Sequence, residues 1–179
     1  MKYFTPELIA RGQSDDSRIL NEVEARWDEL CDEYNAYLDT VKADFPTGIR
    51  HIEDSYYLHD ATIQGMGLRD GALVIMLQLD PPPQSLLTFT YDLVEEPRIE
   101  RNALPEGVRT TGTIVEWQYD EIEKVPGQPP TWRQSILLSN GWEVTLHYRD
   151  VQVEEIQPLL PAPRNGAVTG SLADLTHSA

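Results

Sequence analysis

A histidine and an aspartate stand side by side in the stretch YYLHDATIQGM, at residues 56–66. An imidazole beside a carboxylate can act as a general base with its orienting partner, and the chain has only four histidines, so His59 and Asp60 are the first candidates for chemistry. His147, in VTLHYRD, is the third. These side chains predict a hydrolase or a metal-dependent enzyme only if the fold brings them into one concave pocket.

The pattern around His59 favours a structural role. If residues 58–68 form a strand, neighbouring side chains point to opposite faces, and His59 cannot be oriented by Asp60. Asp60 can instead cap a turn, and His59 can donate to a backbone carbonyl. On the second β-hairpin, His147 is expected to pair with Gln134 on the more polar face. We therefore predict no catalytic residue and keep His59, Asp60 and His147 as weak candidates.

Signatures of metal and cofactor sites are absent from the sequence. It contains no HxH, HExxH or CxxC spacing, no P-loop, no GxGxxG and no GxSxG, so we predict neither a metal nor a cofactor. His51 falls in the expected connection between helix and sheet, and His177 in the C-terminal tail. The only cysteine, Cys31, lies in an apolar helical stripe and is expected to be a small buried residue.

The charge balance limits the classes of partner. The 179 residues carry a formal net charge of −16, with 40% apolar and 25% charged residues. Such acidity disfavours binding to nucleic acid or to an anionic membrane, but permits a basic partner. The start MKYFTPELIARG has no apolar signal-peptide core, and no apolar run approaches the ~18 residues of a membrane span. Together with the lack of any possible intramolecular disulfide, this predicts a cytoplasmic protein.

The first third of the chain reads as helix. Thr5 is a suitable N-cap, Pro6 a suitable first residue and Gly12 a suitable stop for a short helix. A long amphipathic helix is expected from Ser17, because apolar residues recur every three or four positions until Pro46. Residues 15–44 contain ten acids and three bases, which predicts an acidic solvated face.

Beyond Tyr56 the apolar period changes to two. Asp70-Gly71 and Asn140-Gly141 predict two tight hairpins, and about six strands follow one another without intervening helical patterns. This predicts an α+β fold in which the short helix and the long helix pack on an antiparallel sheet. The segment VQVEEI is expected to form an exposed edge strand, since it is rich in charge.

Finer features of the strands can also be predicted. Two glycines on one face, Gly65 and Gly67, are expected to leave a trough for Trp27 or Tyr34. Strict alternation places Trp117 on the opposite side of its strand from Asp120.

In domain terms, residues 1–160 are expected to form one α+β domain, with a helical part at 1–54 and an antiparallel β part at 55–160. Residues 161–179 are expected to be a disordered tail.

The start MKYFTPEL, the long acidic helix and YYLHDATI followed by a hairpin resemble an uncharacterised bacterial family of unknown function. A similar LHD strand opening also occurs in small bacterial proteins that are regarded as toxin-immunity candidates. The resemblance implies no established activity and assigns no site residue.

Three functions remain open from the sequence. The first is a non-catalytic binding protein, with an immunity-type protein that neutralises a basic partner as its sharpest form. The alternative is a hydrolase or metal-dependent enzyme that uses His59 and Asp60. The third is self-association through the stripe of the long helix or through the final edge strand.

Overall fold

The helical start of the chain forms as expected in the computed structural model, which describes residues 1–179 apart from 81, 83, 102–104, 106–112 and 158–179. Helix α1 spans Pro6–Arg11, and the Thr5 hydroxyl accepts a hydrogen bond from the Leu8 N–H at 3.3 Å. Helix α2 spans Ser17–Val41 and continues into a short 3₁₀ turn, η1, at Lys42–Asp44. The predicted tail at 161–179 lies outside the described residues.

A third helix stands where the sequence predicted a simple connection. Helix α3 spans Thr47–Ser55 and buries Ile49 and Ile52 against the strands. Gly48 makes this packing possible, because a Cβ atom at this position would lie 1.6 Å from the Val151 carbonyl oxygen. His51 is therefore an exposed residue of α3, rather than part of an irregular connection.

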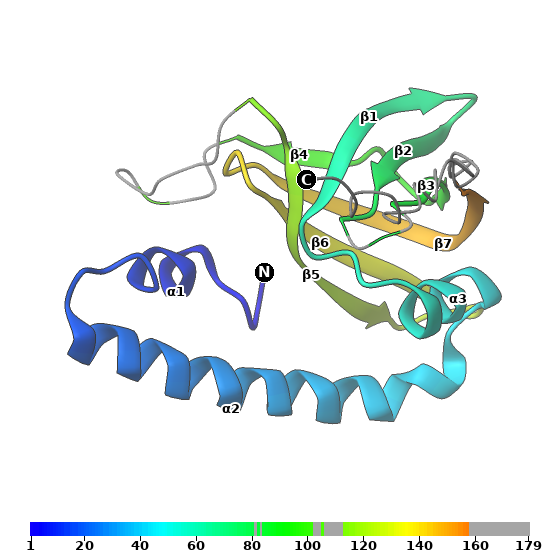
Figure 1. The fold of residues 1–179 in the computed structure, drawn as a ribbon. Helices are drawn as coiled ribbons and strands as arrows, with labels where there is room; N and C mark the ends of the chain where they lie inside the picture. The colour runs from blue at the N-terminus through cyan, green and yellow to red at the C-terminus, as the bar shows by residue number, and fades with distance from the viewer. Residues whose placement is uncertain (81, 83, 102–104, 106–112, 158–179) are drawn as a thin grey trace, which may run out of the picture.

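Seven strands follow, and each pairs with its neighbours in antiparallel fashion. Their bounds are β1 Ala61–Arg69, β2 Ala72–Gln78, β3 Leu86–Leu93, β4 Arg98–Glu100, β5 Glu116–Val125, β6 Thr131–Leu138 and β7 Glu143–Ile156. The strand order is β3-β2-β1-β5-β6-β7-β4, and β3 also pairs with β7. Six strands therefore close into a barrel, and β4 pairs with the start of β7, on the same edge that β3 pairs with further along that strand (Figure 1).

The expectation of α+β content with an antiparallel sheet is confirmed, but the sheet is a closed barrel rather than an open layer. VQVEEI is the second half of β7 rather than a separate strand; it pairs with β3 from Val151 to Ile156, and no described strand pairs with its other edge. Strand β7 has 14 residues, and at Tyr148 it changes its partner from β6 to β3. Because one long strand serves two neighbours, the sheet curls round and closes.

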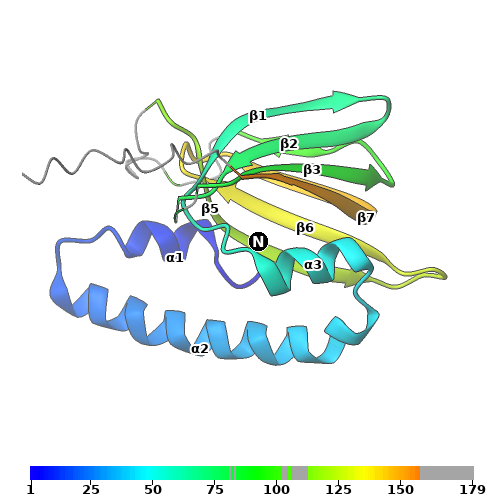
Figure 2. The same ribbon diagram turned by 45° about the vertical axis from the view of Figure 1, so that its right-hand side comes forward.

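The long helix does not cover a sheet face as predicted. It runs beside the barrel along the edge of β5 (Figures 1 and 2), where two tyrosine hydroxyls accept main-chain hydrogen bonds. The Ile122 N–H donates to Tyr34 at 2.7 Å, and the Lys124 N–H donates to Tyr37 at 2.8 Å. Strand β1 pairs with β5 only at Ala61 and Thr62, so the helix borders a part of β5 that β1 leaves unpaired.

Two apolar clusters hold these parts together. The barrel interior is filled by large side chains from all its strands, among them Trp117, Trp132, Phe89, Tyr91 and Tyr148. A second, smaller cluster joins the N-terminal segment, α1, α2 and β5. Its buried members are Tyr3, Phe4, Leu8, Val23 and Leu30.

The two hairpin registers differ in outcome. The first is confirmed, because Leu68 faces Leu73 and Met66 faces Ile75 on either side of Asp70-Gly71. The second is shifted by one residue, so that His147 pairs with Arg133 instead of Gln134. The longer turn explains the shift, since the Leu138 N–H donates to the Trp142 carbonyl at 2.9 Å.

The trough over the two glycines is not filled as predicted. Within the described part of the chain, no atom beyond the adjoining residues lies within 4 Å of a Cβ placed on Gly65 or Gly67. Trp27 and Tyr34 belong instead to the smaller cluster beside β5. The prediction failed because it assumed that α2 lies across the sheet.

Candidate functional site

A β-bulge in β5 determines which side chains meet beside α2 and α3. Trp117 pairs with Leu138 and Tyr119 with Leu137, so Gln118 is an extra residue in its strand. Strict alternation would place Trp117 and Asp120 on opposite faces, but the bulge turns both to the same side. The indole Nε1–H of Trp117 donates to Asp120 Oδ1 at 2.9 Å. The predicted separation of these two residues is therefore wrong.

The segment that contains His59 and Asp60 is a turn, not the start of a strand. Strand β1 begins at Ala61, and the Ala61 N–H donates to the Leu58 carbonyl at 2.9 Å. Asp60 has a φ of 64°, in the left-handed region that aspartate tolerates better than most residues. The turn brings His59 Nε2 to 3.5 Å from Asp60 Oδ1, so the prediction that these side chains diverge is wrong.

Main-chain and amide groups of Gln118 hold this turn in place. His59 Nδ1 contacts the Gln118 carbonyl oxygen, and since a carbonyl only accepts, Nδ1 carries the proton. The side-chain Nε2 of Gln118 donates to Asp60 Oδ1 at 3.2 Å. The imidazole retains 30% of its surface exposed, and its contact with a backbone carbonyl is the one that the sequence analysis allowed for a structural histidine.

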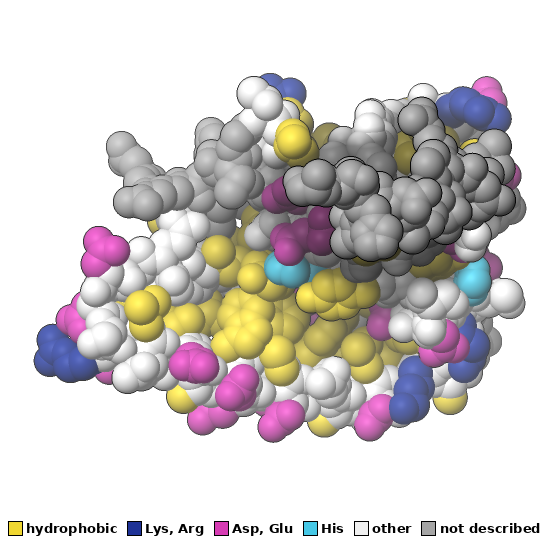
Figure 3. Space-filling view, in the orientation of Figure 1, with side chains coloured by type: hydrophobic (Ala, Val, Ile, Leu, Met, Phe, Trp, Pro, Cys, Tyr) yellow, Lys and Arg dark blue, Asp and Glu magenta, His cyan; other side chains and the backbone are white. Residues whose placement is uncertain are grey.

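His59 borders a recess of about 460 Å³ between the N-terminal segment, α2, α3 and β5. Aromatic side chains form most of its wall, among them Phe4, Trp27, Tyr57 and Tyr119. In Figure 3 hydrophobic side chains gather between α2 and the strands, with a histidine at their upper border and acidic side chains along α2 below them. Asp60 does not line the recess, although His59 does.

The rings form a continuous row. The centroids of Phe4 and Trp27 are 4.9 Å apart, and Trp27 meets Tyr119 edge-on at 4.9 Å. Tyr119 lies 5.2 Å from the His59 ring, and His59 lies 6.0 Å from the Tyr57 ring. Tyr57 has 68% of its surface exposed, so the row leads from the buried cluster to solvent.

Two carboxyl groups share the recess with these rings. Among the described residues, the side-chain donors to Asp120 are both neutral: the Trp117 indole N–H binds one oxygen, and Gln134 Nε2 donates to the other at 2.7 Å. Desolvation raises the pKa of Asp120 above its usual range. Glu53 of α3 is exposed as a residue but lines the recess, where desolvation and the charges of Asp120 and Asp54 raise its pKa to about 7.

Cys31 also lines the recess, but its chemistry is that of an unreactive thiol. It is half-buried on α2 rather than fully buried as the sequence indicated. Desolvation and the nearby charges of Asp28 and Asp32 raise the pKa of the thiol. Because the thiolate is the nucleophile, a raised pKa makes Cys31 a poor one at neutral pH.

The third candidate, His147, lies in a different recess on the outside of the barrel. Its Nε2 is 2.8 Å from the Thr131 hydroxyl, and its Nδ1 is 3.3 Å from Glu95. That recess shares no lining residue with the one beside His59. The structure thus does not bring His147 together with His59, as a common site would require.

Within the described ranges, no three His, Cys, Asp or Glu side chains are grouped so that they could hold a metal ion. No helix in that part of the chain has the length and apolar character needed to cross a membrane. A comparison with known protein families and with curated proteins gives no match to this chain. The resemblance drawn from the sequence therefore stays a prediction.

Sequence reasoning missed the two carboxyl groups of the recess for different reasons. Glu53 lies on α3, which was not predicted, and Asp120 owes its position to a bulge that follows no local motif. The aromatic row is built from segments far apart in the chain, with Phe4 and Tyr119 only 6.0 Å from each other. One usable signal was the stretch YDEIEK, where Asp120 and Glu121 interrupt a strand that should have been apolar on one face.

Proposed function

We propose that the protein is a non-catalytic binding protein that receives a basic protein partner on its acidic surface, with the His59 recess at the centre of the contact. The observation that carries this proposal is the content of the recess. It offers aromatic ring faces and two carboxyl groups, and no lysine or arginine is found among its described lining residues. Such a surface attracts positive charge and repels anions.

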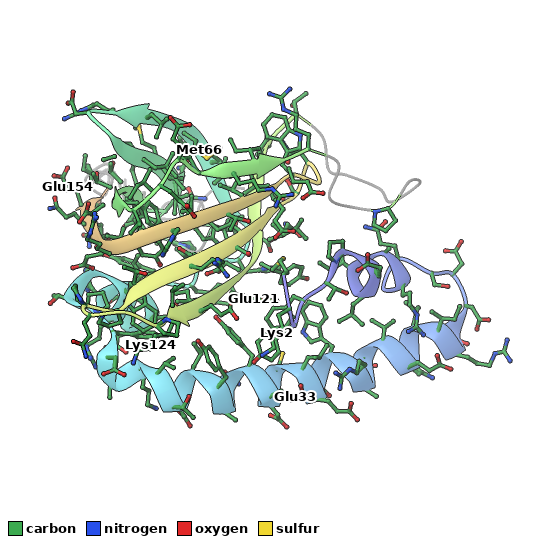
Figure 4. The ribbon with its side chains drawn as sticks, turned by 180° about the vertical axis from the view of Figure 1, so that it is seen from behind. Lys2, Glu33, Met66, Glu121, Lys124 and Glu154 are labelled. Carbon is green, nitrogen blue, oxygen red and sulfur yellow. The ribbon has the colours of Figure 1, made fainter. Side chains whose placement is uncertain are left out.

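The charge distribution supports the same proposal. Two basic side chains of the helices already bind acids of α2: Arg11 of α1 pairs with Glu22, and Arg26 of α2 contacts both Glu29 and Glu33. Residues 15–44 nevertheless retain an excess of acids, and Figure 4 shows Glu33 on the outer side of α2. An uncompensated acidic helix at the rim of the recess would steer a basic partner towards it.

A hydrolase that uses His59 and Asp60 is the second candidate, because their side chains lie 3.5 Å apart. In a working pair the carboxylate holds one imidazole nitrogen and leaves the other to the substrate. Here the Gln118 carbonyl holds Nδ1, and the carboxylate lies beside Nε2, the nitrogen that would have to face the substrate. This arrangement favours the binding function.

The proposal is tested by affinity capture with the immobilised protein, followed by calorimetry with each purified partner. Two acids that flank Cys31 are neutralised together in the variant Asp28→Asn/Asp32→Asn. The matched control is Asp70→Asn/Glu154→Gln, which removes the same charge from exposed positions on the barrel. We expect a basic partner whose dissociation constant rises with salt and in the first variant, but not in the control.

Two outcomes would overturn the proposal. One is a partner whose dissociation constant changes neither with salt nor in the variant Asp28→Asn/Asp32→Asn. The other is a hydrolytic activity that His59→Ala abolishes, which would establish the enzyme instead. Light scattering of the protein alone tests the remaining possibility, self-association, because a stable dimer would scatter as twice the mass.

The immunity-type form of the proposal places the protein in the cytoplasm, where it would neutralise a basic toxin enzyme. It is tested by adding the protein to the activity assay of each enzyme that it captures. Inhibition at one-to-one stoichiometry is expected, and a captured enzyme that keeps its full activity would contradict this form alone.

A further inference from the structure

We propose that the recess beside His59 is a subsite for a single arginine side chain, which the basic partner inserts between the aromatic row and the carboxyl groups of Glu53 and Asp120. This subsite rests on the proposed function in one respect: the guanidinium group is supplied by a protein partner. The chemistry of the site rests on contacts within this chain.

Asp120 lines the recess and has no cationic partner among the described residues. Asp120 is fixed by Trp117 and Gln134, and both of these donors are neutral. Gln134 cannot reverse its amide without loss, because its Oε1 accepts from the hydroxyls of Tyr91 at 3.2 Å and Tyr148 at 3.3 Å. Each Asp120 oxygen thus accepts one hydrogen bond and retains capacity for another. A partly desolvated carboxylate without a cation is costly, and an inserted cation would relieve that cost.

Glu53 adds a second carboxyl group to the lining of the recess. No ion pair of Glu53 occurs among the described residues, although Arg50 lies on the same helix and Lys42 and Lys124 lie on other elements. Lys124 is bound to Asp44, and Arg50 donates to the carbonyl of Phe45 at 3.2 Å. Among the described lining side chains, only His59 can carry positive charge, and its Nε2 lies 3.5 Å from Asp60, which does not line the recess.

The walls select the type of cation. A guanidinium group is planar, weakly hydrated and able to stack on an aromatic face while its N–H groups bind carboxylates. Trp27 and Tyr119 offer such faces, and the exposed Tyr57 stands at the entrance. A lysine ammonium group is strongly hydrated; it would pair with the carboxyl groups but would not stack on the flat rings. The volume of about 460 Å³ is ample for one long side chain and is at the lower end for a typical small-molecule site.

The direct test needs no partner protein. N-acetyl-arginine amide is titrated into the protein while the indole N–H resonances of Trp27 and Trp117 are followed by NMR. N-acetyl-citrulline amide, which has the same shape without the charge, and N-acetyl-lysine amide serve as comparison ligands. We expect saturable shifts of both indoles with the arginine ligand, weaker binding of the lysine ligand and no saturable shift with citrulline.

Variants then locate the site. Asp120→Asn should weaken arginine binding about tenfold, the effect of losing one charge-assisted hydrogen bond, and Glu53→Gln should weaken it by a smaller factor. Glu24→Gln, on the exposed face of α2, is the matched control and should leave the affinity unchanged. If Asp120→Asn folds poorly, Glu53→Gln still decides the question, because Glu53 is an exposed residue of α3.

The inference is overturned if citrulline shifts the indoles as arginine does, or if Glu53→Gln and Glu24→Gln bind equally. If arginine does not bind, the proposed binding function is still tested by the capture experiment, since the acidic helix could bind a basic protein without an inserted arginine. Failure of the capture experiment, with arginine binding intact, would instead assign the recess to a free guanidinium compound.

Discussion

The hydroxyl oxygen of Tyr34 lies 2.7 Å from the main-chain nitrogen of Ile122 and accepts its hydrogen bond. Tyr37, one turn further along α2, does the same for Lys124. Side chains of a helix thus replace the neighbouring strand along a stretch of β5 that β1 does not reach. The arrangement satisfies buried donors and closes an edge that would otherwise be open to another chain.

We predict that Tyr34→Phe lowers the free energy of unfolding by about 1–3 kcal/mol, because it leaves the Ile122 N–H buried without an acceptor. The matched control is Tyr56→Phe, which removes a hydroxyl that contacts Glu155 at the surface and should cost less than about 0.5 kcal/mol. Urea denaturation followed by tryptophan fluorescence measures both. Equal losses in the two variants would show that the hydroxyl of Tyr34 does not support β5.

A second prediction concerns Glu121, whose side chain holds the N-terminal segment against the barrel (Figure 4). Its Oε1 accepts the N–H groups of Tyr3 and Phe4, each at 2.7 Å, and its Oε2 accepts that of Lys2 at 2.6 Å. Glu121→Gln replaces an acceptor by a donor amid three donors. We expect a loss of about 2–4 kcal/mol in the free energy of unfolding.

The control for Glu121→Gln is Glu123→Gln, two residues further along β5. Glu123 is exposed and lies 3.6 Å from Arg133, a surface contact worth less than about 1 kcal/mol. Hydrogen exchange of the Tyr3 and Phe4 amides gives a local readout, and it should accelerate in Glu121→Gln alone. Unchanged protection of these amides would contradict the anchoring role.

The helical start could be predicted from sequence because its signals are local. Thr5, Pro6 and Gly12 act within a single turn, and the stripe of α2 repeats many times. The first hairpin register was predictable for the same reason, since Asp70-Gly71 fixes it by turn geometry alone.

Closure of the barrel could not be predicted in this way. It depends on the pairing of β3 with β7, whose partner residues are 55 to 70 positions apart in the chain, and no turn specifies that contact. No local sequence pattern predicts the bulge at Gln118 either, yet this bulge places Asp120 in the recess. Thus the candidate residues that stood out, His59 and Asp60, were found by their types, whereas the carboxyl groups that line the site were found only through tertiary structure.

A third prediction follows from the close approach of α3 to β7 at Gly48. A Cβ atom there would overlap the Val151 carbonyl oxygen and come within 2.7 Å of Asp150 Oδ1, so the helix would have to shift. Gly48→Ala should cost about 3 kcal/mol or more, despite the better helix propensity of alanine. Gly65→Ala is the control, because its Cβ meets no atom within 4 Å and should change stability by less than about 1 kcal/mol. A neutral Gly48→Ala would show that α3 can move.

The fourth prediction is a pH dependence of stability from Glu53. Its pKa rises from 4.5 to about 7 on folding, so between these values the folded state binds more protons than the unfolded state. The contribution of Glu53 to stability is therefore present at the acidic end of this window and is lost as the pH rises through about 7. The raised pKa of Asp120 acts with the same sign. Urea denaturation at intervals across the window should show that the free energy of unfolding depends less on pH in Glu53→Gln than in the wild type. Identical profiles would contradict the contribution of Glu53.

The last prediction separates the backbone role of Asp60 from a chemical one. Its φ of 64° favours glycine, asparagine and aspartate, and its Oδ1 accepts from Gln118 Nε2 at 3.2 Å. Asp60→Asn keeps both features and should be nearly neutral. Asp60→Gly keeps only the backbone freedom, and Asp60→Ala loses both and should cost about 1–2 kcal/mol. Thermal denaturation of the three variants should give the stability order asparagine, glycine, alanine. If alanine proves as stable as asparagine, the turn does not need this residue, and a chemical role for the carboxylate beside His59 becomes the better explanation for its presence.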